Sequence, residues 1–390
     1  MAGRPGDSRI IVKSHQKWWD FLWVRCSFWY SIGMTLTDVP NLRLENQKIS
    51  QTSFTKPEEV VSWMGAMQAQ DYLGSLWAIG LRTKNYTEKD VEKAIVERKI
   101  VRTWPMRRTL HWVAAQDVHW MVRLSSERVI KTYAAHMPML GLSEEIISKA
   151  RKIVTKALSG GKCMTRDSIY RLFTEAKIPA DQSRGIHILW RLGQEAIVCF
   201  GPRQGKQQTF TLLDEWVPQK RKISREEAIG EVTLRYFTSH GPATIQDLAW
   251  WSGLTVADVK AGVASVKSKL EEEIIDGKQY FMARSQSKIT QSQATLLLPA
   301  FDEYFISYKD RSAVINPEHI SEVNHGLNGM FAPIIVINGR IVGTWKRDIG
   351  KKGITVMPQP FNKFTNADRQ QIAAAARRYG TFLGFSVRVK

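Results

Sequence analysis

The chain has 390 residues, of which 43% are hydrophobic and 24% are charged; this balance is typical of a folded protein and excludes a disordered one. The length exceeds what one hydrophobic core usually supports, so we expect several domains. The net charge of +19, from 56 Lys and Arg against 37 Asp and Glu, predicts binding to a polyanion, either nucleic acid or an anionic membrane.

The membrane is the weaker alternative, because no apolar run approaches the roughly 18 to 20 residues that span a bilayer. Three widely spaced cysteines, Cys26, Cys163 and Cys199, form no C-x-x-C pair and have no histidine cluster beside them. This pattern predicts a reducing compartment and no structural metal. We therefore expect a cytoplasmic protein that needs no metal and no other cofactor.

The first 33 residues differ from the rest. Residues 18–34, "WWDFLWVRCSFWYSIGM", are rich in aromatics, but Asp20 and Arg25 interrupt the apolar run and no small-residue cleavage site follows. A signal peptide fits poorly, so we favour Met34 as the true start and residues 1–33 as a non-native or disordered extension. Without its five basic and two acidic residues the net charge falls by 3, from +19 to +16. The prediction of a polyanionic partner is therefore unchanged.

From Met34 onward one order of elements repeats. Three helices and a hairpin are expected over 142–158, 164–176, 182–195 and 196–213, with Thr165 as an N-cap. The order recurs over 225–241, 244–254, 256–270 and 271–283, with Thr244 as a cap and a turn at Asp276-Gly277. A fainter copy occupies 56–70, 88–99 and the hairpin 100–114. We predict three tandem winged-helix units over 34–140, 141–220 and 221–290; the alternative is an unrelated series of helices and hairpins.

The last hundred residues change character. Residues 294–308, 331–345 and 354–361 are β-rich, with turns at Asn338-Gly339 and Lys352-Gly353, and residues 366–384 predict a helix capped by Asn366. We expect residues 291–390 to form an antiparallel β-barrel-like domain with a terminal helix. The predicted fold class is therefore α+β: three tandem winged-helix units followed by this C-terminal domain.

Winged helices contact DNA through a recognition helix in the major groove and through a hairpin wing on the backbone or minor groove. The three expected hairpin turns carry basic residues suited to phosphates: Arg107, Arg108, Arg203, Lys206 and Lys278. Trp104 is a candidate for stacking on an unpaired base. The alternative is that these cations only solvate exposed turns and that Trp104 belongs to the core.

The stretch 64–77, "MGAMQAQDYLGSLW", places two uncharged amides, Gln68 and Gln70, among residues suited to burial. A buried amide costs free energy unless its donors and acceptors are matched. The sequence contains no phosphate-binding glycine loop, no H-E-x-x-H, no G-x-S-x-G and no metal-ligand spacing. No local motif therefore indicates hydrolase, kinase or redox chemistry, and the role of the two glutamines is open at this point.

Five segments in order, residues 67–82, 101–117, 236–255, 296–312 and 338–347, resemble the AlkZ-like DNA glycosylases, a bacterial winged-helix family. The resemblance covers nearly the whole chain after Met34 and implies three winged helices and a β-barrel around duplex DNA. In that family the pattern Gln, apolar residue, Gln marks the catalytic pair, and Gln68-Ala69-Gln70 matches it. A related subgroup carries Asp at the second position, and this chain does not. We therefore compare it with the crosslink-unhooking branch first.

A monofunctional glycosylase cleaves the bond between C1′ and the base with water as the nucleophile, through an oxocarbenium-like transition state. Purines alkylated at N7 or N3 carry a positive charge and leave without protonation, so the enzyme needs mainly to position a water. An amide carbonyl can accept from that water, although glutamine cannot act as a general base. We predict hydrolysis of such cationic lesions, interstrand crosslinks being candidate substrates, by a monomer acting on alkylated duplex DNA. The alternative is a non-catalytic DNA-binding protein or regulator.

Four further residues have two interpretations each. Asp302 and Arg311 either line the active cleft or form a structural ion pair between barrel and winged helix, and we favour the ion pair. His111 either contacts DNA or is packed in the first hairpin, and we favour packing. Asp71 either orients Gln70 or caps a helix.

Overall fold

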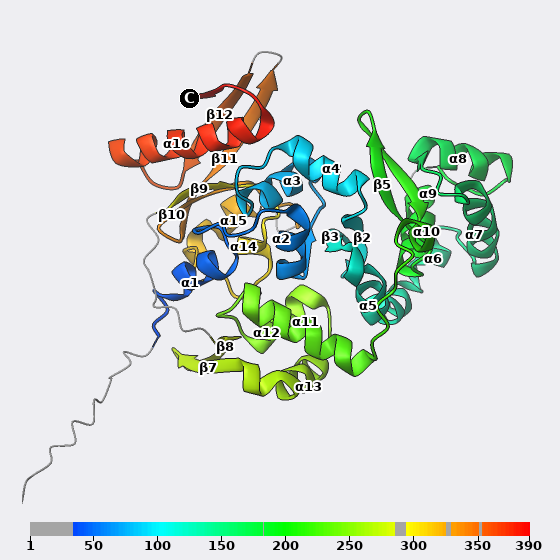
Figure 1. Cartoon of the computed structure of the whole chain (residues 1–390), viewed down its shortest axis with the longest axis horizontal. Helices are drawn as coiled ribbons and strands as arrows, with labels where there is room; N and C mark the ends of the chain where they lie inside the picture. Colours follow the sequence, from blue (N-terminus) through cyan, green and yellow to red (C-terminus); the bar gives the residue numbers. More distant parts are fainter. Residues whose placement is uncertain (1–33, 182, 285–293, 325–328, 351–352) are drawn as a thin grey trace, which may run out of the picture. The chain divides into compact units, whose positions relative to one another are not determined.

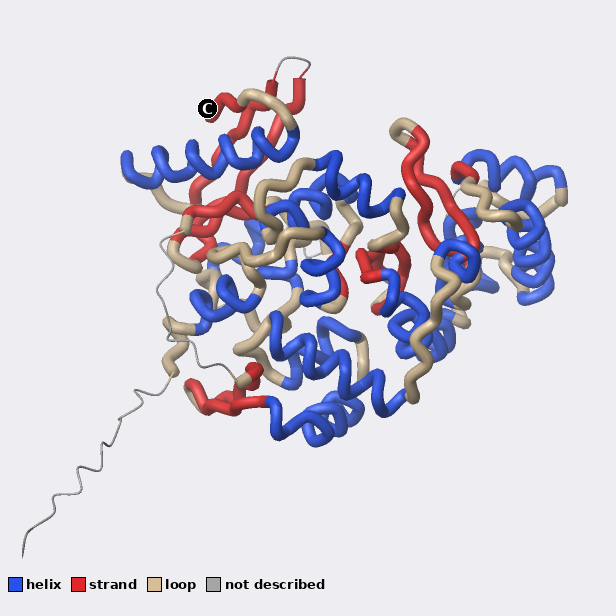
Figure 2. The backbone as a smooth tube through the Cα atoms, in the orientation of Figure 1, coloured by secondary structure: helices blue, strands red, loops and turns tan. Residues whose placement is uncertain are grey.

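The computed structural model describes residues 34–181, 183–284, 294–324, 329–350 and 353–390, and residues 34–390 form one compact unit (Figure 1). The interpretation of residues 1–33 as an extension lies outside the described residues. Among the helices described, none has the length and the apolar character needed to cross a membrane. The hairpin of β7 (Leu270–Ile275) and β8 (Lys278–Ala283) forms a sheet of its own, apart from the two larger sheets (Figure 2).

The first region builds the strand that carries the glutamine pair. Its elements are α1 Val39–Asn46, α2 Pro57–Met64, β1 Ala66–Gln68, α3 Tyr72–Leu81, α4 Glu88–Val96, β2 Ile100–Met106, β3 Thr109–Ala114, α5 Val118–Tyr133 and α6 His136–Met139. The expectation of one helical element over 56–70 is wrong at its C-terminal end. Gly65 has φ of +77°, which ends α2, and the next three residues pair with β3 as a strand. Helix α3 was not expected from the sequence.

The second and third regions follow the predicted order of three helices and a hairpin. The second contains α7 Glu144–Leu158, β4 Met164–Thr165, α8 Arg166–Glu175, α9 Arg184–Gln194, β5 Val198–Gln204, β6 Gln207–Leu212 and α10 Leu213–Trp216. The third contains α11 Arg225–Ser239, α12 Ile245–Ser252, α13 Val256–Val266, β7 Leu270–Ile275 and β8 Lys278–Ala283. Both predicted caps are confirmed, since the hydroxyls of Thr165 and Thr244 accept from the backbone N–H groups of Ser168 and Asp247. Assignment of these regions to the winged-helix class stays a prediction.

Two hairpins that the sequence separates share one sheet. Six strands lie in the order β1-β3-β2-β5-β6-β4, and the first and second regions join where Arg102 of β2 pairs with Phe200 of β5. The third hairpin, β7–β8, forms its own two-stranded sheet. Strand β1 is therefore an edge strand of the six-stranded sheet. It pairs with β3 on one side, and the backbone groups on its other side can bind residues outside the sheet.

The C-terminal region contains β9 Thr295–Leu298, α14 Glu303–Ile306, α15 Ile320–Val323, β10 Ile334–Ile337, β11 Arg340–Gly350, β12 Gly353–Pro360, α16 Asn366–Leu383 and β13 Val387–Val389. The five strands lie in the order β13-β12-β11-β10-β9. The antiparallel expectation is wrong at one edge, because β13 runs parallel to β12. The described strands leave β13 and β9 as edges, so they form an open sheet and not a closed barrel.

Two local predictions for this region need correction, and one is confirmed. The strand expected over 294–308 ends at Leu298, and α14 follows with Asp302 as its N-cap. The cap of α16 is Thr365, which accepts from the N–H of Asp368, and not Asn366. The Asn338-Gly339 turn is confirmed, with φ of 49° and 78°. Lys352 of the other predicted turn lies outside the described residues.

Aromatic packing and a buried ion pair join the C-terminal region to α3. The Trp77 ring lies 5.1 Å from both Tyr379 and Phe382 of α16. The Arg82 guanidinium makes two 3.0 Å hydrogen bonds to Asp302, and neither side chain is exposed. These contacts bring the beginning of α14 beside the end of β1, and this junction forms the candidate site.

Candidate active site

Gln68 and Gln70 stand at the end of β1, where the chain leaves the six-stranded sheet. Strand β1 is antiparallel to β3, and Gln68 lies directly opposite His111. Gln68 is only 9% exposed, whereas Gln70 is exposed. The two amides of the pair therefore have different surroundings, one inside the protein and one at its surface.

Contacts from three other segments fix the backbone of the Gln68-Ala69-Gln70 tripeptide. The Gln68 N–H donates to Oε1 of Glu303 at 2.6 Å, at the edge of β1 that faces away from β3. The Ala69 N–H donates to the Leu110 carbonyl at 2.7 Å. The Ala69 carbonyl accepts from Nε and Nη2 of Arg102, at 3.1 and 2.7 Å. The Gln70 side chain accepts more weakly from the Leu110 N–H at 3.5 Å.

Glu303 is a buried carboxylate shared between regions of the protein. Its Oε2 accepts from Nε1 of Trp251 at 3.0 Å and from the Ser307 hydroxyl, and Nε2 of His240 lies 3.7 Å away. Burial alone would raise the pKa of Glu303. The neighbouring His240, His111 and the Ser307 hydroxyl outweigh burial and lower this pKa to about 2. Glu303 is therefore ionised at neutral pH, with its oxygens occupied by donors.

His111 is fully buried beside Gln68 on the facing strand. Burial and the nearby Arg107 lower the pKa of His111 to about 4, so the imidazole is neutral at neutral pH. Its Nδ1 lies 3.0 Å from the Thr109 carbonyl, which makes Nδ1 the protonated nitrogen. Nε2 of His111 and Oε1 of Gln68 are both buried acceptors with no hydrogen-bond partner among the described residues. The packed position favoured from the sequence is confirmed.

Arg107 and Arg108 form the two-residue turn between β2 and β3, with φ of 50° and 64°. The Arg107 side chain turns inward, and its Nε is buried without a partner among the described residues. Burial lowers the pKa of Arg107, while the charge of Glu303 raises it. Arg108 is exposed, with its guanidinium carbon 4.6 Å from the centroid of the Tyr133 ring.

Trp104 and Arg203 are not placed as the DNA prediction requires. Trp104 is 5% exposed, and its ring packs 5.0 Å from Phe200, so it offers no open face to a base. Arg203 is paired with Glu92, lies 3.7 Å from Glu88 and stacks over Tyr72. The interpretation of Trp104 as core, which the sequence left open, is the correct one, and the charge of Arg203 is already compensated.

The other two predicted wing cations differ from each other. Lys206 is exposed in the β5–β6 turn, and no ion pair involves it among the described residues. Lys278 begins β8 and forms an ion pair with Asp310, so its charge is partly neutralised. Arg108 and Lys206 are therefore the predicted cations that remain open to a phosphate.

The predicted ion pair between Asp302 and Arg311 is not formed, although Asp302 does form a structural ion pair with another arginine. Asp302 joins the C-terminal region to the first region, as expected, but through Arg82. Arg311 donates from Nε to the Phe305 carbonyl at 2.9 Å, and its guanidinium stacks over Phe305. Asp71 caps α3 by accepting from the Gly74 N–H at 3.1 Å, which settles its two interpretations in favour of the cap.

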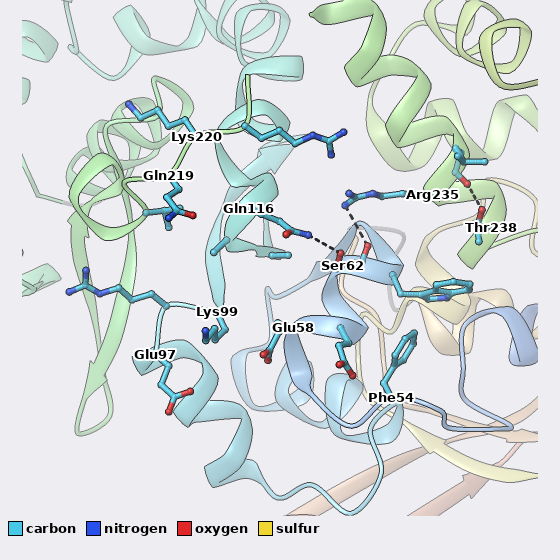
Figure 3. A pocket seen from close by; sticks show the side chains of 18 residues that line it. Phe54, Glu58, Ser62, Glu97, Lys99, Gln116, Gln219, Lys220, Arg235 and Thr238 are labelled. Carbon is cyan, nitrogen blue, oxygen red and sulfur yellow. Dashed lines mark hydrogen bonds between the residues drawn. The ribbon is translucent and has the colours of Figure 1, made fainter. Parts of the chain in front are cut away.

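A cleft of about 1050 Å³ lies near the Ala114 end of β3, away from the Arg107-Arg108 turn (Figure 3). Neither glutamine of the pair lines it. Its cations are largely paired: Arg235 binds Asp117 at 2.6 Å, and Lys220 binds Asp214 at 2.7 Å. A cleft of mixed and neutralised charge is a poor surface for a phosphate backbone.

Sequence reasoning missed two residues that hold the glutamine pair, Glu303 and Arg102. Both are buried charged side chains, which are rare unless paired. The signal for Glu303 was a second acidic residue next to Asp302 in the otherwise apolar "FDEYF". Across the described ranges, no three His, Cys, Asp or Glu side chains gather in a way that could hold a metal ion.

Comparisons with known proteins find relatives over most of the chain. The pattern of the family described as DNA glycosylase AlkZ-like matches residues 61–382. A Streptomyces sahachiroi protein named interstrand DNA cross-link repair glycosylase is 23% identical over 353 residues, covering 87% of this chain and 95% of that protein. The solved structure of Streptomyces sahachiroi DNA glycosylase AlkZ superposes with a TM-score of 0.76 at 22% identity, covering 92% of this chain and all of that one.

Proposed function

The chain belongs to the AlkZ-like DNA glycosylase family, and on that premise we propose that it hydrolyses the N-glycosidic bond of N7- or N3-alkylated purines in duplex DNA. The observation that carries the proposal is the Gln68 amide, whose buried Oε1 accepts no hydrogen bond from the described residues. A buried acceptor left unmatched by the protein costs about 1 to 3 kcal/mol. That cost is offset if a water or substrate group binds there.

Gln68 and His111 together would match a single water molecule once DNA binding gives it access, because both acceptors are buried from solvent. The two residues lie opposite each other on adjacent strands, so their side chains project from the same face of the sheet. Both Oε1 of Gln68 and Nε2 of the neutral His111 are acceptors. A water that donates one hydrogen to each has its lone pairs directed away from both, toward an attacked C1′.

Gln70 has the complementary position at the surface. Its exposed side chain has an amide NH₂ that can donate to a phosphate or sugar oxygen of bound DNA, while its carbonyl is held near the Leu110 N–H. Since Glu303, Arg102 and β3 fix the backbone on both sides, the two amides keep one relative position. Such preorganisation lowers the entropy lost when the reacting groups align.

Cationic lesions are the substrates that these surroundings favour. Hydrolysis of an uncharged base needs an acid to protonate the leaving group. Glu303 is ionised and His111 is neutral near pH 7, so neither holds a proton that it readily donates. A purine already alkylated at N7 or N3 departs as a neutral base and needs no acid. Among the described residues, none of the hydrogen bonds to the tripeptide comes from a lysine, which supports a water nucleophile and a monofunctional enzyme.

The macromolecular partner that we propose is duplex DNA bound by a monomer. The net charge of +19 and the exposed Arg108 and Lys206 favour phosphate contacts. Interstrand crosslinks are included among the proposed substrates because the Streptomyces relative is named for their repair. The alternative function, DNA binding without catalysis, uses the same cations and leaves the unmatched acceptors of Gln68 and His111 without a role.

The deciding experiment is single-turnover incubation with duplex DNA that contains N7-methylguanine, followed by alkaline cleavage of abasic sites. We expect excision by the wild type and a decrease on the order of 10² to 10³ in Gln68→Ala, the loss typical of removing one preorganised polar contact. Gln70→Ala should also slow excision, while Gln70→Glu supplies a carboxylate and should retain more activity. Gln371→Ala, which changes an exposed glutamine of α16 in the C-terminal region, is the control for a glutamine-to-alanine substitution.

Circular dichroism and thermal melting must show that each variant is folded, because a buried amide replaced by Ala can also disturb the site. If the wild-type protein excises no N7- or N3-alkylated purine, the glycosylase proposal is wrong and the alternative, DNA binding without catalysis, is favoured. The same conclusion would follow from a folded double Ala variant that excises as fast as the wild type.

A further inference from the structure

A hollow of about 330 Å³ lies at the tip of the first hairpin, next to the glutamine pair. We call it the tip hollow; it is lined by Trp104, Arg107, Arg108, Thr109, Tyr133, Ile186, His187 and Trp190. Thr109 is adjacent in the chain to Leu110, whose N–H reaches Gln70. The hollow and the proposed reaction site are therefore built on neighbouring residues of one strand.

The tip hollow has a rigid aromatic wall. Nδ1 of His187 lies 2.6 Å from the Ser183 carbonyl, so this nitrogen carries the proton and Nε2 is an acceptor. The Tyr133 hydroxyl lies 3.0 Å from that Nε2 and donates to it. The Tyr133 ring is half-buried and meets Trp190 edge-on with centroids 4.9 Å apart. Its orientation is thus fixed before any ligand binds.

The hairpin tip is fastened to the two helices that supply this wall. Ser125 of α5 donates to the Pro105 carbonyl at 2.6 Å, and Gln194 of α9 donates to the Trp104 carbonyl at 2.9 Å. Between these anchors and β3, Arg107 and Arg108 both have positive φ. The left-handed conformation costs roughly 1 to 2 kcal/mol for an ordinary L-residue, and such strain is often kept at binding sites.

The charge of the tip hollow selects among aromatic ligands. Two arginines line it, Arg108 with an exposed side chain and Arg107 with a side chain that turns inward, and no acidic residue does. A cationic purine would be repelled there. The Arg108 guanidinium lies 4.6 Å from the centre of the Tyr133 ring, so an uncharged base stacks on Tyr133 when Arg108 turns from the ring to bind the phosphate of that base. The lesion of the proposed reaction is cationic, so it does not fit this hollow. The base opposite the lesion is uncharged and loses its partner when the lesion is displaced or excised.

We propose that the tip hollow binds the unpaired base of the strand opposite the lesion, stacked on Tyr133 with its phosphate on Arg108. The choice of strand rests on the proposed function, because it follows from the positive charge of the lesion. Binding there keeps the opposite strand in place while the glutamine pair acts on the damaged strand.

The test compares two duplexes with the full chain. One carries a tetrahydrofuran abasic-site analogue opposite cytosine, and the other carries the analogue on both strands. We expect the wild type to bind the first about 5 to 150 times more tightly, the range that corresponds to base–aromatic stacking of about 1 to 3 kcal/mol. Equal affinities would overturn the proposal without requiring any variant.

Variants then show whether the tighter binding of the duplex with an opposite cytosine depends on the tip hollow. Tyr133→Ala should abolish it, and Tyr133→Phe, which keeps the ring, should retain most of it. Tyr170→Ala is the matched control, because Tyr170 is also a half-buried tyrosine with an arginine above its ring. A folded Tyr133→Ala protein that keeps the preference would refute the site.

Excision of N7-methylguanine, measured on the same preparations, separates this inference from the proposed function. Excision with no preference for the opposite base would refute the tip hollow and leave the glycosylase proposal standing. A preference without excision would keep the base site and refute the glycosylase. A Tyr133→Ala protein that loses excision but keeps the preference would mean that the hollow holds the lesion, which contradicts the proposal.

Discussion

The first and third hairpins turn with the same backbone conformation but with different residues. Arg107 and Arg108 connect β2 to β3 with φ of 50° and 64°, and Asp276 and Gly277 connect β7 to β8 with φ of 49° and 73°. Asp-Gly is among the preferred pairs for such a turn, whereas Arg-Arg is not. The third hairpin therefore forms its turn from local preference, and the first depends on surrounding contacts.

The contrast extends from the turns to the strands. In the first hairpin every residue of β2 is buried, and β3 carries His111 beside Gln68. In the third hairpin β7 carries three consecutive glutamates with little burial, and it pairs with β8 alone. A hairpin held by tertiary contacts can retain strained and unmatched groups, which are the groups that bind or react.

The largest expected effect comes from removing Glu303, the α14 carboxylate that binds β1 on the edge facing away from the first hairpin. Glu303→Ala leaves the buried donors of Gln68, Trp251 and Ser307 without their acceptor. We expect the free energy of unfolding to fall by about 3 to 5 kcal/mol, measured by urea denaturation. Glu273→Ala, in the third hairpin and exposed, should change it by less than about 0.5 kcal/mol. Similar losses in both variants would remove the contrast between the hairpins.

The second effect is a dependence of stability on pH that arises from two buried groups, His111 of the first hairpin and Glu303 of α14. The folded pKa of His111 is about 4 against an ordinary 6.5, and that of Glu303 is about 2 against 4.5. In both cases the unfolded chain binds the proton first, so acid favours unfolding. We expect stability to fall between about pH 6.5 and 4 through His111, and between about pH 4.5 and 2 through Glu303.

The urea concentration at the midpoint of unfolding, measured from about pH 7 to about pH 2, checks the two pH ranges in which stability is expected to fall. His111→Gln should reduce the fall in stability in the upper pH range, to which His240 and His119 also contribute because burial lowers their pKa values as well. Glu303→Gln should reduce the fall in the lower pH range. Glu273→Gln in the third hairpin should leave both unchanged. A wild-type midpoint that stays constant from pH 7 to pH 4 would show that His111 is not the buried neutral group described here.

Exchanging the turn residues should give an effect of intermediate size. Gly277→Arg places an ordinary residue at φ of 73°, where a Cβ meets no atom within 4 Å, so we expect a loss of about 1 to 2 kcal/mol from backbone strain alone. Arg108→Asn should gain about 0.5 kcal/mol, since Asn tolerates positive φ better. Thermal melting measures both changes, and a destabilised Arg108→Asn protein would mean that the Arg108 side chain contributes more than its conformation costs.

The smallest expected effect concerns the salt dependence of duplex binding. Arg108→Ala and Lys206→Ala should each reduce the magnitude of the slope of log K against log salt by about 0.9, because each removes an open phosphate contact. Lys278→Ala and Arg203→Ala should change the slope less, since acidic partners already neutralise these cations. Fluorescence anisotropy from 50 to 200 mM salt measures the slopes. Equal changes in all four variants would contradict the distinction between open and paired cations.

Local sequence patterns predicted a large part of the fold. The caps of α8 and α12 at Thr165 and Thr244, and the turns at Asp276-Gly277 and Asn338-Gly339, all lie where the sequence places them. These features depend on residues within one turn of each other, so nearby sequence is enough. Strand β1 was missed because its three residues are stabilised by pairing with β3, more than forty residues away in the chain.

The sequence by itself determined the positive charge, the repeated order of helices and hairpins, and the glutamine pair that marks the candidate site. The tertiary structure alone decided what surrounds that pair. Glu303, 235 residues away, binds the Gln68 backbone, and Arg82 takes the place expected for Arg311 beside Asp302. Buried charges are stable only with partners in the right geometry, and those partners come from distant segments. Their identity therefore follows from the packing of the regions and not from any local pattern.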